Sequence, residues 1–225
     1  MTDYSVQSIL AIVPRWSRSN PLALAVLVSL YEKPMHPYEV AQTLRSRAKQ
    51  ESVRLNYGSL YAVVESLEKK GFIKATGTVR EGKRPERTVY AITDDGAREM
   101  NEWMTELISV PSKEYPAFLA GLSFLPSLPP DEALAALRAR GEALKVKLAG
   151  MRGAMKAASD AGLPRIFELE TEYEEQQLRA ELKFVTALVD EMANGTLEGI
   201  DMWGMFHTEG FNSEEVEFTF DFPEE

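Results

Sequence analysis

Four basic side chains lie close together in the first half of the chain, within segment 77–87, which also contains glycine and proline. They are Arg80, Lys83, Arg84 and Arg87. Two glutamates share the segment, so its net charge is still positive. Guanidinium and ammonium groups bind phosphate oxygens, and we therefore expect this segment to bind a polyanion such as a nucleic acid. The alternative is an ordinary exposed loop whose charges serve solubility.

The residue inventory argues against catalysis. The chain has no cysteine, which excludes disulfides, Cys-ligated zinc, iron–sulfur clusters and a thiol nucleophile. Its two histidines, His36 and His207, are far apart in the sequence. No carboxylate pair, phosphate-binding glycine loop or nucleophile–base pair stands in a suitable context. We therefore expect no enzymatic activity, no metal and no cofactor.

The acidic charge of the chain is unevenly distributed. The net charge is −10 over 225 residues, but residues 1–100 carry +4 and residues 101–225 carry −14. Because phosphates respond to charges within about 10 Å, we assign polyanion binding to the first half. The apolar run at residues 22–30 is shorter than the roughly 20 residues that span a membrane. No signal-peptide pattern surrounds it, so we expect a cytoplasmic protein with no membrane partner.

Three amphipathic helices are predicted before the basic segment. Apolar residues recur at helical spacing in residues 20–30 and 36–44, and in a third helix that starts between residues 56 and 59 and ends at Lys70. The period then changes from 3.6 to 2, which predicts strands at 72–76 and 88–92. Three helices followed by a two-stranded hairpin with a basic tip are typical of a winged helix-turn-helix, a DNA-binding fold.

The second half of the chain is predicted to be helical. A fourth helix begins at Thr93 and ends at Val110-Pro111, where we place the domain boundary. Two long helices follow, one opened by Asp131 and one running from about Arg165 to Ala193, with apolar residues every three or four positions. An antiparallel pair of this kind cannot bury both of its apolar faces by itself. The simplest partner that could bury the remaining face is a second copy of the chain, so we expect a homodimer.

The predicted fold class is mainly α with a small β-hairpin wing. We divide the chain into a winged helix-turn-helix domain (1–110), an α-helical dimerisation domain (111–195) and an acidic, aromatic tail (196–225). The run 216–222 alternates apolar and polar residues like a half-buried strand, so the tail either docks on a sheet edge or is mobile. Its acidic residues could also compete with phosphate for the basic hairpin and so damp DNA binding.

These segments resemble the PadR family of bacterial transcriptional regulators, in the subfamily with a long helical C-terminal half. The likeness is specific over residues 20–108 and looser over residues 118–144. It rests on Leu24-Ala25-Val26-Leu27, Met35-His36-Pro37-Tyr38-Glu39, Gly58-Ser59-Leu60-Tyr61, the run from Leu67 to Ile73, and the run from Gly82 to Thr93 with Gly96. The resemblance implies a homodimer that binds double-stranded DNA at an inverted-repeat operator. Such proteins are usually repressors, often released by a small aromatic or drug-like effector.

One departure from the family affects the expected DNA contacts. The third helix commonly carries basic residues after the tyrosine, where this sequence has Ala62, Glu65 and Ser66. We therefore expect phosphate anchoring to depend more on the hairpin and on neutral hydrogen-bond donors.

The order of elements assigns candidate DNA contacts. In this fold the third helix reads base edges from its N-terminal end, and the second helix points its N-terminus at the DNA backbone. The candidates are Tyr38, Asn56, Tyr57, Ser59, Tyr61, Arg80, Lys83, Arg84 and Arg87, of which Lys83 and Arg84 are the strongest. Alternatively, Asn56 or Ser59 only caps the helix, Tyr61 belongs partly to the core and Tyr38 is purely structural.

An effector site and a second function class are also considered. Met100, Trp103 and Met104 could form an apolar platform for a flat aromatic ligand between subunits, or they could simply be dimer core. The alternative function is a protein-docking adaptor without sequence-specific DNA binding, which the acidic charge and the weakly basic third helix would also fit.

Overall fold

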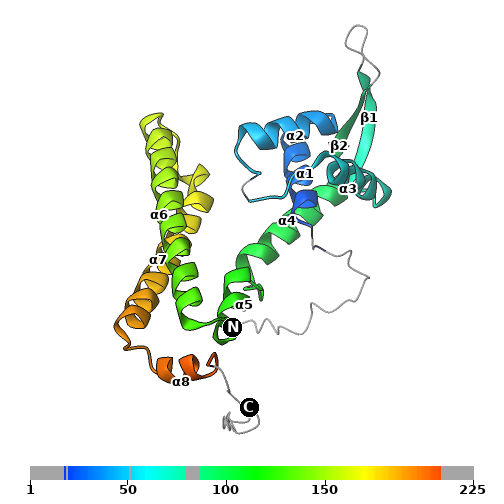
Figure 1. Ribbon diagram of the computed structural model, residues 1–225. Coiled ribbons are helices and arrows are strands. Elements are labelled where there is room, and N and C mark those ends of the chain that lie inside the picture. Colours follow the sequence, from blue (N-terminus) through cyan, green and yellow to red (C-terminus); the bar gives the residue numbers. More distant parts are fainter. Residues whose placement is uncertain (1–17, 19, 51, 80–86, 209–225) are drawn as a thin grey trace, which may run out of the picture. The chain divides into compact units, whose positions relative to one another are not determined.

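The computed structural model describes residues 18, 20–50, 52–79 and 87–208, and the chain divides into two compact units, Met1–Lys113 and Glu114–Glu225. The described elements are mostly helices, with one two-stranded antiparallel hairpin (Figure 1). The predicted fold class, mainly α with a small β-hairpin, is confirmed. Within these described ranges, no helix combines the length and apolar character needed to cross a membrane.

The first unit contains four helices and the hairpin. In chain order these are α1 (Pro21–Glu32), α2 (Pro37–Ser46), α3 (Tyr57–Lys69), β1 (Ile73–Val79), β2 (Arg87–Ile92) and α4 (Asp94–Ser109). Polar side chains fix where the four helices begin. Asn20, His36, Asn56 and Thr93 each accept a hydrogen bond from a backbone N–H of the first turn, which would otherwise have no partner within the helix.

One apolar core holds these helices together. Val26 and Leu27 of α1 and Leu60 and Leu67 of α3 have no exposed surface, and Trp103 of α4 packs into the same cluster. The predicted trihelical unit is therefore present, with α4 as an additional helix against it.

The hairpin is longer than predicted and is fixed to the helices at its base. The strands run over residues 73–79 and 87–92 rather than 72–76 and 88–92. The N–H of Met35 donates to the carbonyl of Tyr90, and the N–H of Tyr90 donates back to the carbonyl of Met35, both at 3.1 Å. The connection between α1 and α2 thereby holds β2. Three of the predicted basic contacts at the hairpin tip lie outside the described residues: Arg80, Lys83 and Arg84.

The start of α4 packs tightly against the chain before β1. Thr93 Oγ1 donates to the Gly71 carbonyl oxygen at 2.7 Å and also accepts the Gly96 N–H at 3.1 Å. A Cβ atom at Gly96 would lie 2.0 Å from the carbonyl oxygen of Phe72. This position therefore requires glycine, because any side chain would overlap the backbone.

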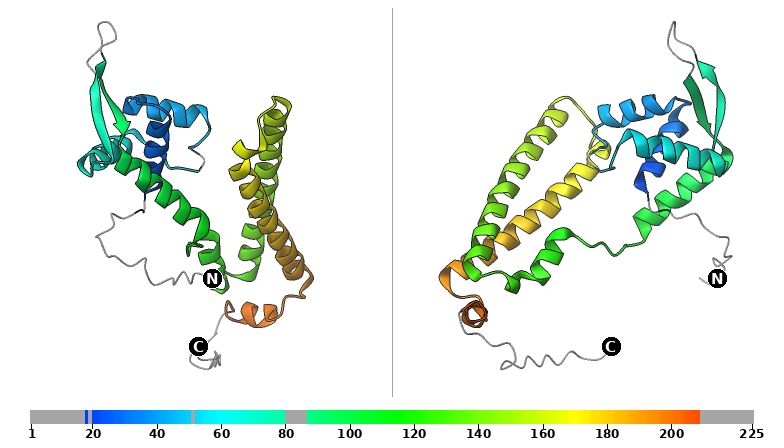
Figure 2. Two further views of the ribbon diagram at one scale, coloured as in Figure 1. Left: turned by 180° about the vertical axis from the view of Figure 1, so that it is seen from behind. Right: turned by 45° about the vertical axis from the view of Figure 1, so that its right-hand side comes forward.

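The second unit is built on a helical hairpin. Its elements are α5 (Ala117–Ser123), a 3₁₀ turn (Leu125–Ser127), α6 (Pro130–Asp160), a 3₁₀ turn (Arg165–Phe167), α7 (Leu169–Asn194) and α8 (Ile200–Met205). Figure 2 shows α6 and α7 side by side in opposite directions. Leu137, Leu144 and Leu148 of α6 and Val185 of α7 are buried in the shared core. The predicted pair of long helices is confirmed, although the second begins at Leu169 because the 3₁₀ turn precedes it.

Residues 196–208 differ from the prediction of a tail that starts at residue 196. Trp203 of α8 is 7% exposed and its Nε1–H donates to the Leu128 carbonyl at 2.8 Å. This part of the predicted tail therefore packs with the second unit. The alternating run 216–222 lies outside the described residues.

Candidate nucleic-acid interface

The α3 helix buries one face and exposes tyrosines on the other. Leu60, Val63 and Leu67 pack in the core, whereas Tyr57 and Tyr61 are 38% and 48% exposed. These tyrosines stand at positions 1 and 5 of the helix, one turn apart. Tyr61 is thus too exposed to be a core residue, and both hydroxyl groups belong to side chains that a partner can contact.

The N-terminus of α3 is closed by its own cap. Asn56 Oδ1 accepts the backbone N–H of Ser59 at 2.7 Å. The helix-cap role that was one alternative for Asn56 is present. A DNA contact by Asn56 or by the half-buried Ser59 remains a prediction, and a cap is compatible with it.

Two tyrosines and two arginines from three elements form one cluster on the first unit. The rings of Tyr38 (α2) and Tyr57 (α3) are stacked at a centroid distance of 6.2 Å and an interplanar angle of 10°. Arg45 Nη1 donates to the Tyr57 hydroxyl at 2.6 Å, and its Cζ lies 4.7 Å from the centre of that ring. The Cζ of Arg87 (β2) lies 5.7 Å from the centre of the Tyr38 ring. We call Tyr38, Arg45, Tyr57 and Arg87 the tyrosine–arginine patch.

The patch presents positive charge that α3 does not have. Between Tyr57 and Glu68 this helix carries no Lys or Arg, and both Ala62 and Glu65 are exposed. Arg45 brings a guanidinium to the α3 N-terminus from α2, and Arg87 brings another from the hairpin. An aromatic ring holds a cation without neutralising its charge, so both arginines can still bind phosphate oxygens.

Sequence reasoning did not single out Arg45. The available signal was its position seven residues after Tyr38, which places both side chains on the same face of α2. Three of the predicted contacts, Tyr38, Tyr57 and Arg87, are brought together by the structure. Tyr61 lies near them, with its ring 6.4 Å from that of His36 in an edge-on arrangement.

His36 has a structural role at the start of α2. Its Nδ1 accepts the Tyr38 N–H at 3.0 Å, and Glu39 Oε2 accepts the His36 N–H at 2.7 Å, which forms a reciprocal capping box. Burial and the charge of Arg87 lower the pKa of His36, against a smaller upward effect of Glu39. The lowered pKa fits the cap, because Nδ1 can accept a hydrogen bond only when it is unprotonated.

The predicted effector residues do not share one surface. Met100 and Trp103 are 7% and 1% exposed in the core of the first unit, whereas Met104 is 40% exposed. The two buried side chains stabilise the fold. An effector platform formed by all three residues stays a prediction. Of the three side chains, Met104 is the one that a ligand can contact in the first unit.

The chain is similar to known regulators. Residues 26–102 match the model of the family described as "Transcriptional regulator PadR-like family". A probable transcriptional regulator of Mycobacterium tuberculosis, Rv1176c, is 32% identical over 85 residues, which are 38% of this chain and 44% of the relative. The match thus spans less than half the length of that curated relative.

Two solved structures share the fold over most of the chain. Bacillus subtilis PadR in complex with operator DNA has a TM-score of 0.64 and 18% sequence identity, covering 77% of this chain and 99% of PadR. The same protein in complex with p-coumaric acid has a TM-score of 0.62 at 18% identity, covering 76% and 98%. The winged helix-turn-helix unit of the chain is therefore similar in sequence to PadR-like transcriptional regulators, and the fold is that of Bacillus subtilis PadR.

Proposed function

We propose that this protein is a homodimeric regulator of transcription that binds an inverted repeat in double-stranded DNA. We further propose that it acts as a repressor. The observation that carries the proposal is the tyrosine–arginine patch, which gathers hydroxyl groups and cations from α2, α3 and β2 on one surface. The related PadR of Bacillus subtilis has been solved with operator DNA, which supports the same use of the fold here.

In the proposed complex α3 lies in the major groove with its N-terminus toward the bases. Tyr57, Ser59 and Tyr61 are then near base edges or the adjacent phosphates, and the hydroxyl groups act as neutral donors. Arg45 and Arg87 bind phosphates beside the N-terminus of this helix. Lys83 and Arg84 at the hairpin tip enter the neighbouring minor groove, where the negative potential attracts arginine.

Dimerisation is assigned to the second unit. Val146 on α6 and Phe184 on α7 are 73% and 50% exposed, so the helical hairpin leaves apolar surface that a second copy can cover. Two copies present two copies of α3, which matches the two half-sites of an inverted repeat. Sedimentation velocity should give twice the mass of one chain at micromolar concentration, and a monomer would contradict this assignment.

We further propose that a small aromatic molecule releases the DNA, as p-coumaric acid is a ligand of the related PadR. A screen of small aromatic acids against the protein–DNA complex tests this proposal. At least one of them should lower the DNA affinity without unfolding the protein. A complex that resists every aromatic acid in the screen would contradict regulation by this class of molecule.

The central experiment is footprinting of the purified protein on genomic DNA, with binding then measured on the recovered fragment. We expect protection of an inverted repeat. Lys83→Ala and Arg84→Ala should each flatten the slope of log K against log salt by about 0.9, the contribution of one phosphate contact. A protein that binds no duplex at low salt, but captures a protein partner through the same patch, would support the docking adaptor instead.

A further inference from the structure

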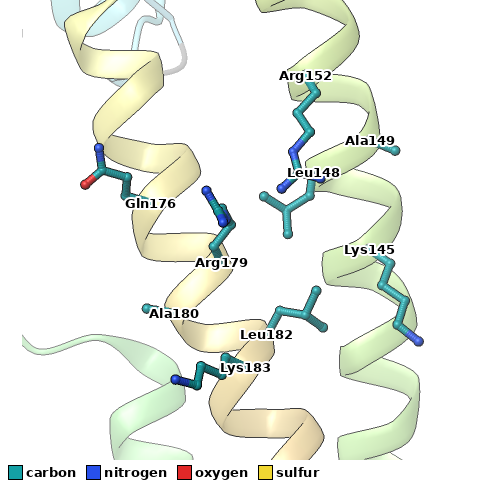
Figure 3. Close-up of a pocket in the computed structure, with 9 residues that line it drawn as sticks. All are labelled: Lys145, Leu148, Ala149, Arg152, Gln176, Arg179, Ala180, Leu182 and Lys183. Carbon is teal, nitrogen blue, oxygen red and sulfur yellow. The ribbon is translucent and has the colours of Figure 1, made fainter.

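A groove of about 690 Å³ runs between α6 and α7 on the second unit. Its volume lies in the range of sites that bind ligands or peptide side chains. The apolar residues that line it are Leu148, Ala149, Ala180 and Leu182, and the basic residues are Lys145, Arg152, Arg179 and Lys183. Figure 3 shows Leu148 and Leu182 between the two helices, with Lys145 and Lys183 on their outer sides.

The groove keeps a surplus of positive charge. Arg152 Nη2 lies 3.1 Å from Glu175 Oε1, and Arg179 Nη1 lies 3.7 Å from the other oxygen of the same carboxylate, so two arginines share one negative charge. Lys145 pairs with Glu142 at 2.8 Å. In the part of the chain that the structure describes, Lys183 makes no ion pair.

The positive charge of the groove contrasts with the acidic composition of the second half of the chain. Residues 101–225 contain ten Lys and Arg and 24 Asp and Glu, yet four of the ten basic residues line this one groove. A cationic rim over an apolar floor fits an occupant with the opposite charge and an apolar face. Charge complementarity therefore favours an acidic, aromatic ligand.

The chain carries such a segment outside the described residues. Residues 209–225 contain seven Asp and Glu and no Lys or Arg. Within them, Val216, Phe218, Phe220 and Phe222 alternate with Glu217, Thr219 and Asp221. In an extended chain alternate side chains point to opposite sides, so one side of this segment would be apolar and the other acidic.

The segment is long enough to reach the groove. The last described residue is Thr208, which follows α8. The α8 helix contacts the start of α6. It therefore lies at the end of the α6–α7 pair where α6 begins and α7 ends. Lys183 lies about 17 Å back along α7 from Asn194, at about 1.5 Å per helical residue. Residues 209–215 span up to about 23 Å when extended, which is longer than this stretch of α7.

We propose that residues 214–222 dock in extended form into the α6–α7 groove of their own chain. The phenylalanines cover the accessible apolar surface of Ala149, Ala180 and Leu182. Glu217 and Asp221 stay within reach of the long side chains of the rim. The interaction is partly electrostatic, so high salt weakens it.

The absence of cysteine allows a direct test by double spin labelling of the full-length chain. Labels at Thr219→Cys in the segment and at Gln176→Cys, an exposed residue in the lining of the groove, report the distance between them. We expect a narrow distribution at short distance in low salt, which broadens in high salt. Dilution with unlabelled chain should leave the distribution unchanged, because both labels are on one molecule.

Charge reversal in the groove provides the decisive comparison. Lys183→Glu should lower the docking equilibrium constant by roughly 2- to 30-fold, as expected for exchanging one surface attraction for a repulsion. Lys156→Glu is the matched control, since Lys156 lies on α6 outside the groove and pairs with Asp160 at 2.8 Å. A broad distribution in the parent protein, an equal response in both variants, or loss of the short distance on dilution would each overturn docking within one chain.

Discussion

Arg45 provides the sharpest test of the proposed DNA interface, because sequence reasoning did not predict its position. Its guanidinium donates to the Tyr57 hydroxyl at 2.6 Å, beside the N-terminus of α3. If this face lies on DNA, Arg45 neutralises a phosphate and releases about one counterion on binding. Arg45→Ala should therefore reduce the DNA affinity most strongly at low salt.

The magnitude follows from counterion release. One lost phosphate contact lowers the slope of log K against log salt by about 0.9. Over a fourfold increase in salt, from about 50 to 200 mM, the affinity of the variant should consequently fall about 3.5-fold less than that of the parent protein. Fluorescence anisotropy with a labelled operator fragment measures both slopes.

Arg47→Ala is the matched control. Arg47 caps the same helix two residues further on, but both of its Nη atoms donate to the carboxylate of Glu32, one of them at 2.7 Å. Because Glu32 already neutralises this cation, its removal should leave the salt slope unchanged. An unchanged slope in Arg45→Ala, or equal changes in both variants, would refute the assignment of the patch to DNA.

Three further predictions concern the stability of the first unit. The pKa of His36 is lower in the folded protein than its ordinary value of 6.5, so the neutral cap stabilises the fold at pH values above 6.5. This contribution to the unfolding free energy is lost as the pH falls through the pKa of the folded state. His36→Asn, which keeps a capping acceptor, should therefore flatten the pH dependence of the unfolding free energy between about pH 7 and pH 5. Gly96→Ala places Cβ 2.0 Å from the Phe72 carbonyl oxygen and should cost about 1–3 kcal/mol in urea unfolding. Arg18 donates to both carboxylate oxygens of Glu99, at 2.7 and 3.0 Å, and its side chain is 10% exposed. Arg18→Ala should therefore lower the unfolding free energy by about 1.5–3 kcal/mol in the same assay. A loss below about 0.5 kcal/mol, the usual effect of a surface substitution, would contradict this role.

Local signals were sufficient to predict the helices of the first unit. Asn20 and Thr93 cap helices at the predicted positions, and the apolar spacing of Leu60, Val63 and Leu67 identified the buried face of α3. Caps and periodicity act within one or two turns, so a single sequence contains them in full. The order of three helices and a hairpin then predicted the fold.

Contacts between distant residues could not be predicted in the same way. The hydrogen bond from Arg45 to Tyr57 and the ion pairs of Arg18 with α4 join residues whose spacing follows no helical or strand period. The α8 helix was missed because its six residues are too few for a period, and only the burial of Trp203 against Leu128 fixes it. These features depend on tertiary packing rather than on local pattern.

In the proposed complex, the arrangement of the first unit allows an acidic protein to bind a polyanion. A third helix without cations before Lys69 would contact phosphate poorly if it acted alone. Arg45 and Arg87 are placed at its N-terminus by α2 and β2, and that terminus itself carries partial positive charge. The net charge of −14 in residues 101–225 is largely screened beyond about 10 Å. Binding strength should consequently follow the charge of this one face rather than the charge of the whole chain.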